Sequence, residues 1–150
     1  GGERSSVSGG FGNDASGHSC SISGGHDNTA SGLADSISGG VGNVASGGST
    51  WIGGGRDNTA SYSMATVSGG AENQATGLNA TISGGSYNTC SGSYTTISGG
   101  RANTATGWHA SVSGGRLNSA SGDFSSVSGG NTRTASGTDD WVAGSLVEDN

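Results

Sequence analysis

The sequence predicts an all-β fold: a flattened β-solenoid, or β-roll, of ten 15-residue coils with two short strands in each coil. A branched residue recurs every 15 residues, at Val7, Ile22, Ile37, Ile52, Val67, Ile82, Ile97, Val112, Val127 and Val142. An asparagine series (Asn13 to Asn118) and a small apolar series (Ala15 to Ala135) keep the same interval. Glycine supplies 33 of the 150 residues, which disfavours helices. A fixed period without insertions indicates a repeat architecture in which each unit is stabilised by its neighbours.

The strands and corners of each coil are predicted from the two halves of the repeat. One half reads Asn-x-Ala-Ser-Gly and the other reads x-Val-Ser-Gly-Gly, and small apolar and polar residues alternate within each half. This alternation is typical of a strand. Glycines at the ends of both halves indicate tight corners, where a positive φ or a close backbone approach is needed. Coils stacked at about 4.7–4.8 Å would form a rod about 47 Å long.

The alternation also predicts which residues point inward. We expect Val or Ile, Ala and Asn to face the interior, with the asparagines forming a ladder of side-chain amides bonded to the next coil. The predicted core is one branched residue and one alanine wide. The bulky residues fall in the corners, at Phe11, Leu33, Tyr62, Met64, Leu78, Tyr87, Tyr94, Trp108, Leu117 and Phe124.

Residues 1–150 are predicted to form one solenoid domain, with the last coil (136–150) acting as a C-terminal cap. The tail Glu-Asp-Asn breaks the repeat and is typical of a polar cap. Cys20 and Cys90 occupy different positions in the repeat, so we expect no disulfide between them.

Charge and composition argue against several classes of function. The net charge is −6, which disfavours a nucleic-acid partner. No stretch approaches the roughly 20 apolar residues that cross a bilayer, so membrane insertion is not expected. His18, His26 and His109 occupy three different repeat positions, which argues against a stacked metal site. No nucleophile motif is present, and we expect neither enzymatic activity nor a cofactor.

Two outward rows of hydroxyl side chains are predicted. The row beside the inward alanines is expected to contain Thr29, Ser31, Thr59, Ser61, Thr76, Thr89, Ser91, Thr104, Thr106, Ser119, Ser121, Thr134 and Ser136, interrupted by Asp14, Val44 and Gln74. The row beside Val and Ile contains Ser21/Ser23, Ser36/Ser38, Thr66/Ser68, Thr81/Ser83, Thr96/Ser98, Ser111/Ser113 and Ser126/Ser128, interrupted by Trp51 and Trp141.

A flat lattice of hydroxyls can order water at its surface. Neighbours on one strand face lie about 6.6–6.8 Å apart and coils repeat at about 4.7 Å, spacings that resemble those of oxygen atoms in ice. The alternative is that Ser and Thr simply suit a soluble strand surface. The first row holds seven threonines and the second holds three, so we favour the first row as an ice-binding face.

The pattern Asn-Thr-Ala-Ser-Gly followed by Val-Ser-Gly-Gly resembles the ice-binding β-rolls of perennial ryegrass and the Ser/Gly-rich ice-binding proteins of polar algae. Its outward Thr-x-Thr pairs on a 15-residue coil are similar to those of insect antifreeze solenoids. This resemblance implies adsorption to ice crystals without a cofactor, through the first row. It also implies a secreted or extracellular protein.

A second resemblance supplies the alternative function. The segments Ala15-Ser16-Gly17 and Ile22-Ser23-Gly24-Gly25 are similar to the repeats in the β-roll heads of trimeric autotransporter adhesins, with one extra residue per coil. That family would imply a structural or adhesive module, a homotrimer and a cell-surface location.

Overall fold

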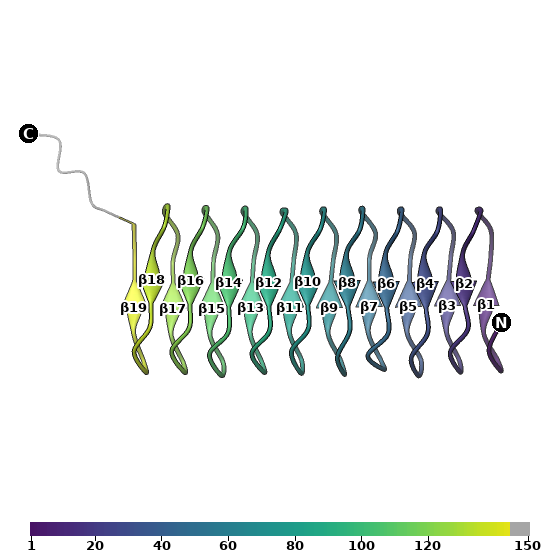
Figure 1. Cartoon of the computed structure of the whole chain (residues 1–150), viewed down its shortest axis with the longest axis horizontal. Coiled ribbons are helices and arrows are strands. Elements are labelled where there is room, and N and C mark those ends of the chain that lie inside the picture. The colour runs from purple at the N-terminus through teal and green to yellow at the C-terminus, as the bar shows by residue number, and fades with distance from the viewer. Residues whose placement is uncertain (145–150) are drawn as a thin grey trace, which may run out of the picture.

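The computed structural model describes residues 1–144, and within them the chain is an all-β solenoid of about nine turns, without helices. Nineteen two-residue strands alternate between two parallel sheets, so that each turn of the rod contributes one strand to each sheet (Figure 1). One sheet has ten strands, one from each predicted repeat, and the other has nine. The predicted fold class is therefore confirmed.

The strands of both sheets recur with the 15-residue period. The ten-stranded sheet consists of β1 (Ser6–Val7), β3 (Ser21–Ile22), β5 (Ser36–Ile37), β7 (Trp51–Ile52), β9 (Thr66–Val67), β11 (Thr81–Ile82), β13 (Thr96–Ile97), β15 (Ser111–Val112), β17 (Ser126–Val127) and β19 (Trp141–Val142). The nine-stranded sheet consists of β2 (Asp14–Ala15), β4 (Thr29–Ala30), β6 (Val44–Ala45), β8 (Thr59–Ala60), β10 (Gln74–Ala75), β12 (Thr89–Cys90), β14 (Thr104–Ala105), β16 (Ser119–Ala120) and β18 (Thr134–Ala135).

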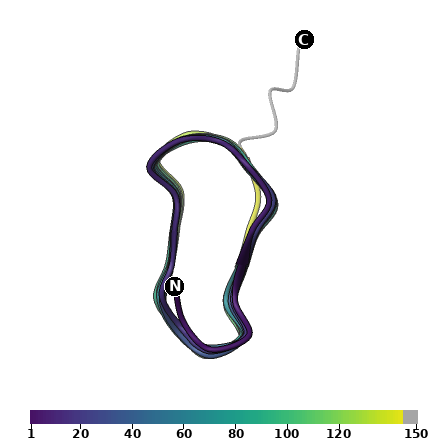
Figure 2. The same ribbon diagram turned by 90° about the vertical axis from the view of Figure 1, so that its right-hand side faces the viewer.

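Backbone hydrogen bonds between successive coils hold the rod together. The N–H of Thr29 donates to the carbonyl of Asn43 at 2.8 Å, and equivalent bonds recur in successive coils. Because every strand pairs with the strand 15 residues away, equivalent residues lie directly beside one another. Viewed along the rod, the coils nearly superpose (Figure 2), so each repeat position forms a straight column along the molecule.

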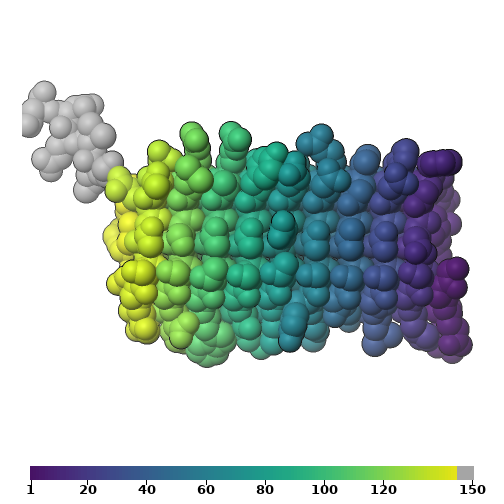
Figure 3. All heavy atoms as spheres, in the orientation of Figure 1, coloured from purple at the N-terminus to yellow at the C-terminus, as the bar shows by residue number. Residues whose placement is uncertain are grey.

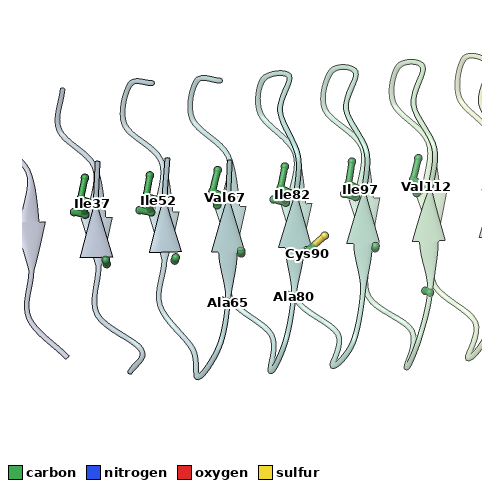
Figure 4. Close-up of a cluster of buried hydrophobic side chains, with 14 of the residues drawn as sticks. Ile37, Ile52, Ala65, Val67, Ala80, Ile82, Cys90, Ile97 and Val112 are labelled. Carbon is green, nitrogen blue, oxygen red and sulfur yellow. The ribbon is translucent and has the colours of Figure 1, made fainter. Parts of the chain in front are cut away.

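The core is wider than predicted. The branched residues and the alanine column are buried as expected, and Figure 4 shows Ile37, Ile52 and Val67 pointing the same way from successive strands. A further inward column, which we call the variable column, was missed. It consists of Ser5, Cys20, Asp35, Thr50, Ala65, Ala80, Thr95, Ala110, Ser125 and Asp140. All its members from Cys20 to Ser125 are buried. Their side chains are small but chemically unlike, so no residue pattern revealed them.

The predicted asparagine ladder is confirmed from Asn13 to Asn118. Each side-chain oxygen accepts the backbone N–H of the next member, as in the 3.0 Å bond from Asn73 to Asn58. Each amide nitrogen also donates to two glycine carbonyls, which for Asn58 are those of Gly54 and Gly70 at 3.0 Å. The ladder ends at Arg133, whose N–H donates to Asn118 at 2.9 Å.

Glycine serves the corners in the two ways predicted. Gly100 has a φ of +90°, and Gly107 lies so close to the next coil that an added Cβ would stand 2.0 Å from the carbonyl oxygen of Gly122. However, about half of the left-handed positions within residues 1–144 are not glycine. Seventeen other residues, among them Ala102 and His109, have φ between 52° and 60°. Left-handed backbone was thus predicted only in part, because the stacked coils hold ordinary residues in it.

The ends of the rod differ from its middle. Val7 in β1 is 45% exposed, whereas the equivalent residues from Ile22 to Val127 are at most 1% exposed. At the other end Val142 is partly buried against the core. The predicted cap begins within the described residues, but its Glu-Asp-Asn tail lies outside them. Cys20 and Cys90 are both buried and free, as expected from their different repeat positions.

Candidate functional site: the hydroxyl faces

The outward surface of the nine-stranded sheet, which we call the first face, carries the predicted ice-binding residues. Each coil contributes two outward positions, one on either side of the buried alanine. Adjacent strands pair in exact register, with Thr89 beside Thr104 and Thr104 beside Ser119. The structure therefore brings all the predicted residues of this row onto one surface, in two columns.

The two columns of the first face differ in continuity. The predicted interruptions by Asp14, Val44 and Gln74 affect only the column before the alanine. The column after it carries a hydroxyl in every coil, at Ser16, Ser31, Ser46, Ser61, Thr76, Ser91, Thr106, Ser121 and Ser136. Ser16 and Ser46, whose partners in the other column are Asp14 and Val44, were missing from the predicted row. Both columns are uninterrupted in the four coils from Thr89 to Ser136.

Most hydroxyls of the first face point to solvent. Residues before the alanine are mostly half-buried by their neighbours, whereas most residues after it are exposed. Among the hydroxyls of the first face within residues 1–144, only that of Thr76 donates to a protein group, the carbonyl of Cys90 at 3.5 Å. The remaining hydroxyls of the row make no side-chain hydrogen bond in this part of the chain, so they are available to water.

The ten-stranded sheet presents the second face, which is also hydroxylated. Between Trp51 and Trp141 it carries five uninterrupted coils, from Thr66 to Ser128, and its three threonines, Thr66, Thr81 and Thr96, lie side by side. In this face Ser111 donates to the hydroxyl of Ser126 at 3.1 Å. Both faces are thus flat hydroxyl surfaces, and they differ in which coils are interrupted.

The two tryptophans lie on the second face rather than projecting from it. The indole nitrogen of Trp51 donates to the hydroxyl of Ser38 at 3.3 Å, and that of Trp141 donates to Ser128 at 2.8 Å. A Cβ added to Gly53 would stand 3.0 Å from the indole of Trp51. Gly53 replaces the usual serine two residues after the strand start, which leaves room for the ring. Local packing therefore explains the position of Trp51.

One corner of the coil is formed by the segments that lead from each odd-numbered strand to the next even-numbered strand. Within residues 1–144 it carries seven of the fourteen charged residues. The guanidinium of Arg56 forms two ion pairs: its Nε lies 3.5 Å from Oδ2 of Asp57 and its Nη2 lies 3.8 Å from Oε1 of Glu72. A hydrogen bond to Glu72, followed by the charge of that carboxylate, raises the pKa of Tyr87. The guanidinium of Arg101 lies 5.8 Å from the centre of the Tyr87 ring. We call this edge the charged corner; it is the upper edge in Figure 3, from which several long side chains project.

The histidines are dispersed, as their repeat positions predicted. The Nε2 atom of His18 lies 3.8 Å from Oε2 of Glu3, and that of His26 lies 2.9 Å from Oδ2 of Asp27. The ring of His109 stacks on that of Tyr94. Within residues 1–144 no group of three or more His, Cys, Asp or Glu side chains could hold a metal ion. The described part of the chain also contains no pocket. In the same residues there is no apolar helix long enough to span a bilayer.

No protein-family model matches this chain, and a search of curated proteins gives no match.

Proposed function

We propose that this protein adsorbs to ice through the first face of the solenoid. The observation that supports this proposal is the in-register array from Thr89 to Ser136, in which both outward columns carry hydroxyls in four successive coils. Four of these eight residues are threonines, against three of ten in the five uninterrupted coils of the second face. The surface is flat, free of charge in these coils and held by a continuous backbone ladder. Such a surface can present ordered water at regular spacings, set by the strand and coil repeats.

Rigidity favours this proposal. A surface that binds a crystal must keep its lattice of contacts without a large loss of side-chain freedom on binding. Threonine suits this role because its branched side chain has few rotamers. The residues of the first column are also half-buried by neighbours in the adjacent coils, which further restricts them.

The test is thermal hysteresis with observation of crystal shape. We expect the protein to facet ice crystals and open a gap between melting and freezing temperatures. A Thr104→Tyr, Thr106→Tyr variant should lose most of this activity, because two large rings in the middle of the array would hold the surface off the crystal. The matched control is Thr81→Tyr, Ser83→Tyr on the second face, with circular dichroism to check that both variants fold.

The control also decides between the faces. If only the second-face variant loses activity, the ice-binding surface is the second face, on the ten-stranded sheet. If the unsubstituted protein leaves crystals round and freely growing, ice binding is wrong.

A structural or adhesive module is the second candidate function, and exposed apolar side chains at one corner of the coil favour it. Leu33, Met64 and Phe124 are 48–61% exposed there, which is unusual for a surface that only contacts water. The adhesin resemblance implies a cell-surface homotrimer. Light scattering would measure the mass of such a trimer directly. Trimerisation together with the absence of ice shaping would favour this function.

A further inference from the structure

The corner opposite the charged corner forms an apolar ridge along the rod. It lies in the segments that lead from each even-numbered strand to the next odd-numbered strand. Its large side chains are Leu33, Tyr62, Met64, Leu78, Tyr94, Trp108 and Phe124. All except the half-buried Leu78 are 43–61% exposed. Because the coils superpose along the rod (Figure 2), these residues line a single straight edge.

The aromatic part of the apolar ridge is pre-organised. The ring of His109 stacks between those of Tyr94 and Phe124, at centroid distances of 4.8 and 5.5 Å and interplanar angles of 7° and 3°. Trp108 packs edge-on against His109 and Phe124, at 4.3 and 4.8 Å. Rings that are already ordered lose little conformational freedom when a partner covers them.

The middle of the apolar ridge is also almost free of charge, whereas its ends carry Glu3, Arg4, Asp123, Asp139 and Asp140. Its segments between residues 16 and 109 contain one acidic residue, Asp35, which is fully buried, and no lysine or arginine. The next acidic side chain toward the C-terminus is that of Asp123. The charged corner, by contrast, carries Arg56, Asp57 and Glu72 in contact with one another. Exposed apolar side chains occur at both corners, but only the apolar ridge combines them with a long stretch free of exposed charge.

The exposed area of the apolar ridge is close to what a stable protein interface needs. Large apolar and aromatic side chains offer about 150–250 Å² each. With six of them about half exposed, the ridge presents roughly 600 Å², before its serines and asparagine are counted. A standard interface buries about 800 Å² on each partner.

We propose that two copies of this chain pack ridge to ridge in antiparallel orientation, with a two-fold axis at Leu78. Two rods with the same coil spacing stay in register along their whole length. A two-fold axis at Leu78 places Trp108, His109 and Phe124 opposite small residues and Tyr94 opposite Met64. The corner of Trp108 and His109 faces that of Gly48 and Ser49, and Phe124 faces Ala34.

Charge favours the antiparallel arrangement over a parallel one. Parallel packing would place Asp123 against its own copy, and likewise Asp139, which costs free energy between like charges. Antiparallel packing instead separates these like charges, because Asp139 lies opposite Ser19, beside His18, and Asp123 lies opposite Leu33. Residue i then contacts residue j and residue j contacts residue i, as in an isologous dimer. Both hydroxyl faces remain exposed in this dimer, so the inference does not depend on the proposed ice binding.

The oligomeric state in solution is the first test. Light scattering coupled to size exclusion should give the mass of a dimer. The variant Tyr94→Ser, Phe124→Ser should weaken association by at least about tenfold for each aromatic removed. The control Val41→Ser, Leu117→Ser removes two similarly exposed apolar side chains from the charged corner and should leave the dimer intact. A monomer, a trimer or equal weakening by both variants would overturn the proposal.

Cysteine crosslinking tests the orientation. The native thiols of Cys20 and Cys90 are buried and do not compete. Under mild oxidation Leu78→Cys should link to its own copy, and Ala34→Cys should link to Phe124→Cys when the two variants are mixed. Phe124→Cys alone should not link to itself. Self-linking of Phe124→Cys at the rate of Leu78→Cys would indicate parallel packing and contradict the inference.

Discussion

The asparagine ladder and the variable column are both buried inside the same coils, yet one keeps a single residue type and the other does not. The ladder repeats asparagine eight times, from Asn13 to Asn118. The variable column contains serine, cysteine, aspartate, threonine and alanine. Both columns are equally enclosed, so burial alone does not explain why one is uniform.

The difference lies in where the backbone N–H of each column finds its acceptor. In the ladder, that acceptor is the side chain of the previous asparagine, as between Asn58 and Asn43 at 3.0 Å. In the variable column most N–H groups donate to a carbonyl in their own coil, as Ala110 does to Gly107 at 3.2 Å. Those of Cys20 and Thr50 are exceptions, because they donate to the side chains of Ser5 and Asp35 in the previous coil. A position whose side chain completes the backbone hydrogen bonding of the next coil must keep that side chain. A position where the backbone satisfies itself needs only a small residue.

The largest expected effect comes from removing one member of the ladder. Asn58→Ala should lower the free energy of unfolding by about 3–5 kcal/mol, since it leaves the N–H of Asn73 and the carbonyl of Gly54 without partners in a buried site. Urea denaturation measures this change. The matched variant Thr95→Ala, in the variable column, removes one hydrogen bond to Gly92 and should cost about 1 kcal/mol. Equal losses would contradict the distinction between the two columns.

Asp35 sharpens the comparison because it belongs to the variable column and yet acts like a ladder residue. Its carboxylate accepts the N–H groups of Gly32, Gly48 and Thr50 at 2.8–3.0 Å, and the Thr50 hydroxyl at 2.7 Å. Asp35→Ala should cost about 2–4 kcal/mol, less than Asn58→Ala because the mutation also removes a buried charge. Asp35→Asn keeps one acceptor oxygen and should cost less. A change below that of Thr95→Ala would contradict this role.

Cys90 replaces alanine in the apolar core, and burial raises the pKa of its thiol from 9.0 to about 11. Because the folded pKa lies above the unfolded one, this thiol does not affect stability below about pH 9. Stability is lost as the pH rises from there to about 11, by about 2–3 kcal/mol. Unfolding measured from pH 8 upward should show this loss relative to Cys90→Ala. If the free energy of unfolding changes with pH in the same way for the unsubstituted protein and for Cys90→Ala, the raised pKa of the Cys90 thiol is wrong.

The smallest expected effect is at a corner, where the stacked coils hold residues of several types in the left-handed conformation. Ala102 has a φ of 54°, a strained conformation for alanine. Ala102→Gly relieves that strain but makes the unfolded chain more flexible, so stability should change by less than about 0.5 kcal/mol. Ala105→Gly, in the buried strand β14, should lower it by about 1–2 kcal/mol. Thermal unfolding of both variants measures these changes. Equal losses of stability for Ala102→Gly and Ala105→Gly would contradict the distinction between corner and core.

The sequence by itself determined the repeat, the two sheets, the inward asparagines and the outward hydroxyl rows. These features recur in every coil, so ten copies of a weak local pattern add to one strong one. The sequence also placed Phe11, Tyr94 and Trp108 in the corners, because large side chains fit neither the thin core nor the close contacts between coils. It did not separate an apolar corner from a charged one.

Only the tertiary structure decided the features that depend on neighbours 15 residues apart. The variable column was hidden because Cys20, Asp35 and Thr50 share no chemistry, and only stacking shows that they fill the same space. In the same way, the rings of Tyr94, His109 and Phe124 form a single stack only once the coils lie in register. A period reveals which positions are equivalent, whereas contacts between unlike residues at one position arise only when the chain is coiled.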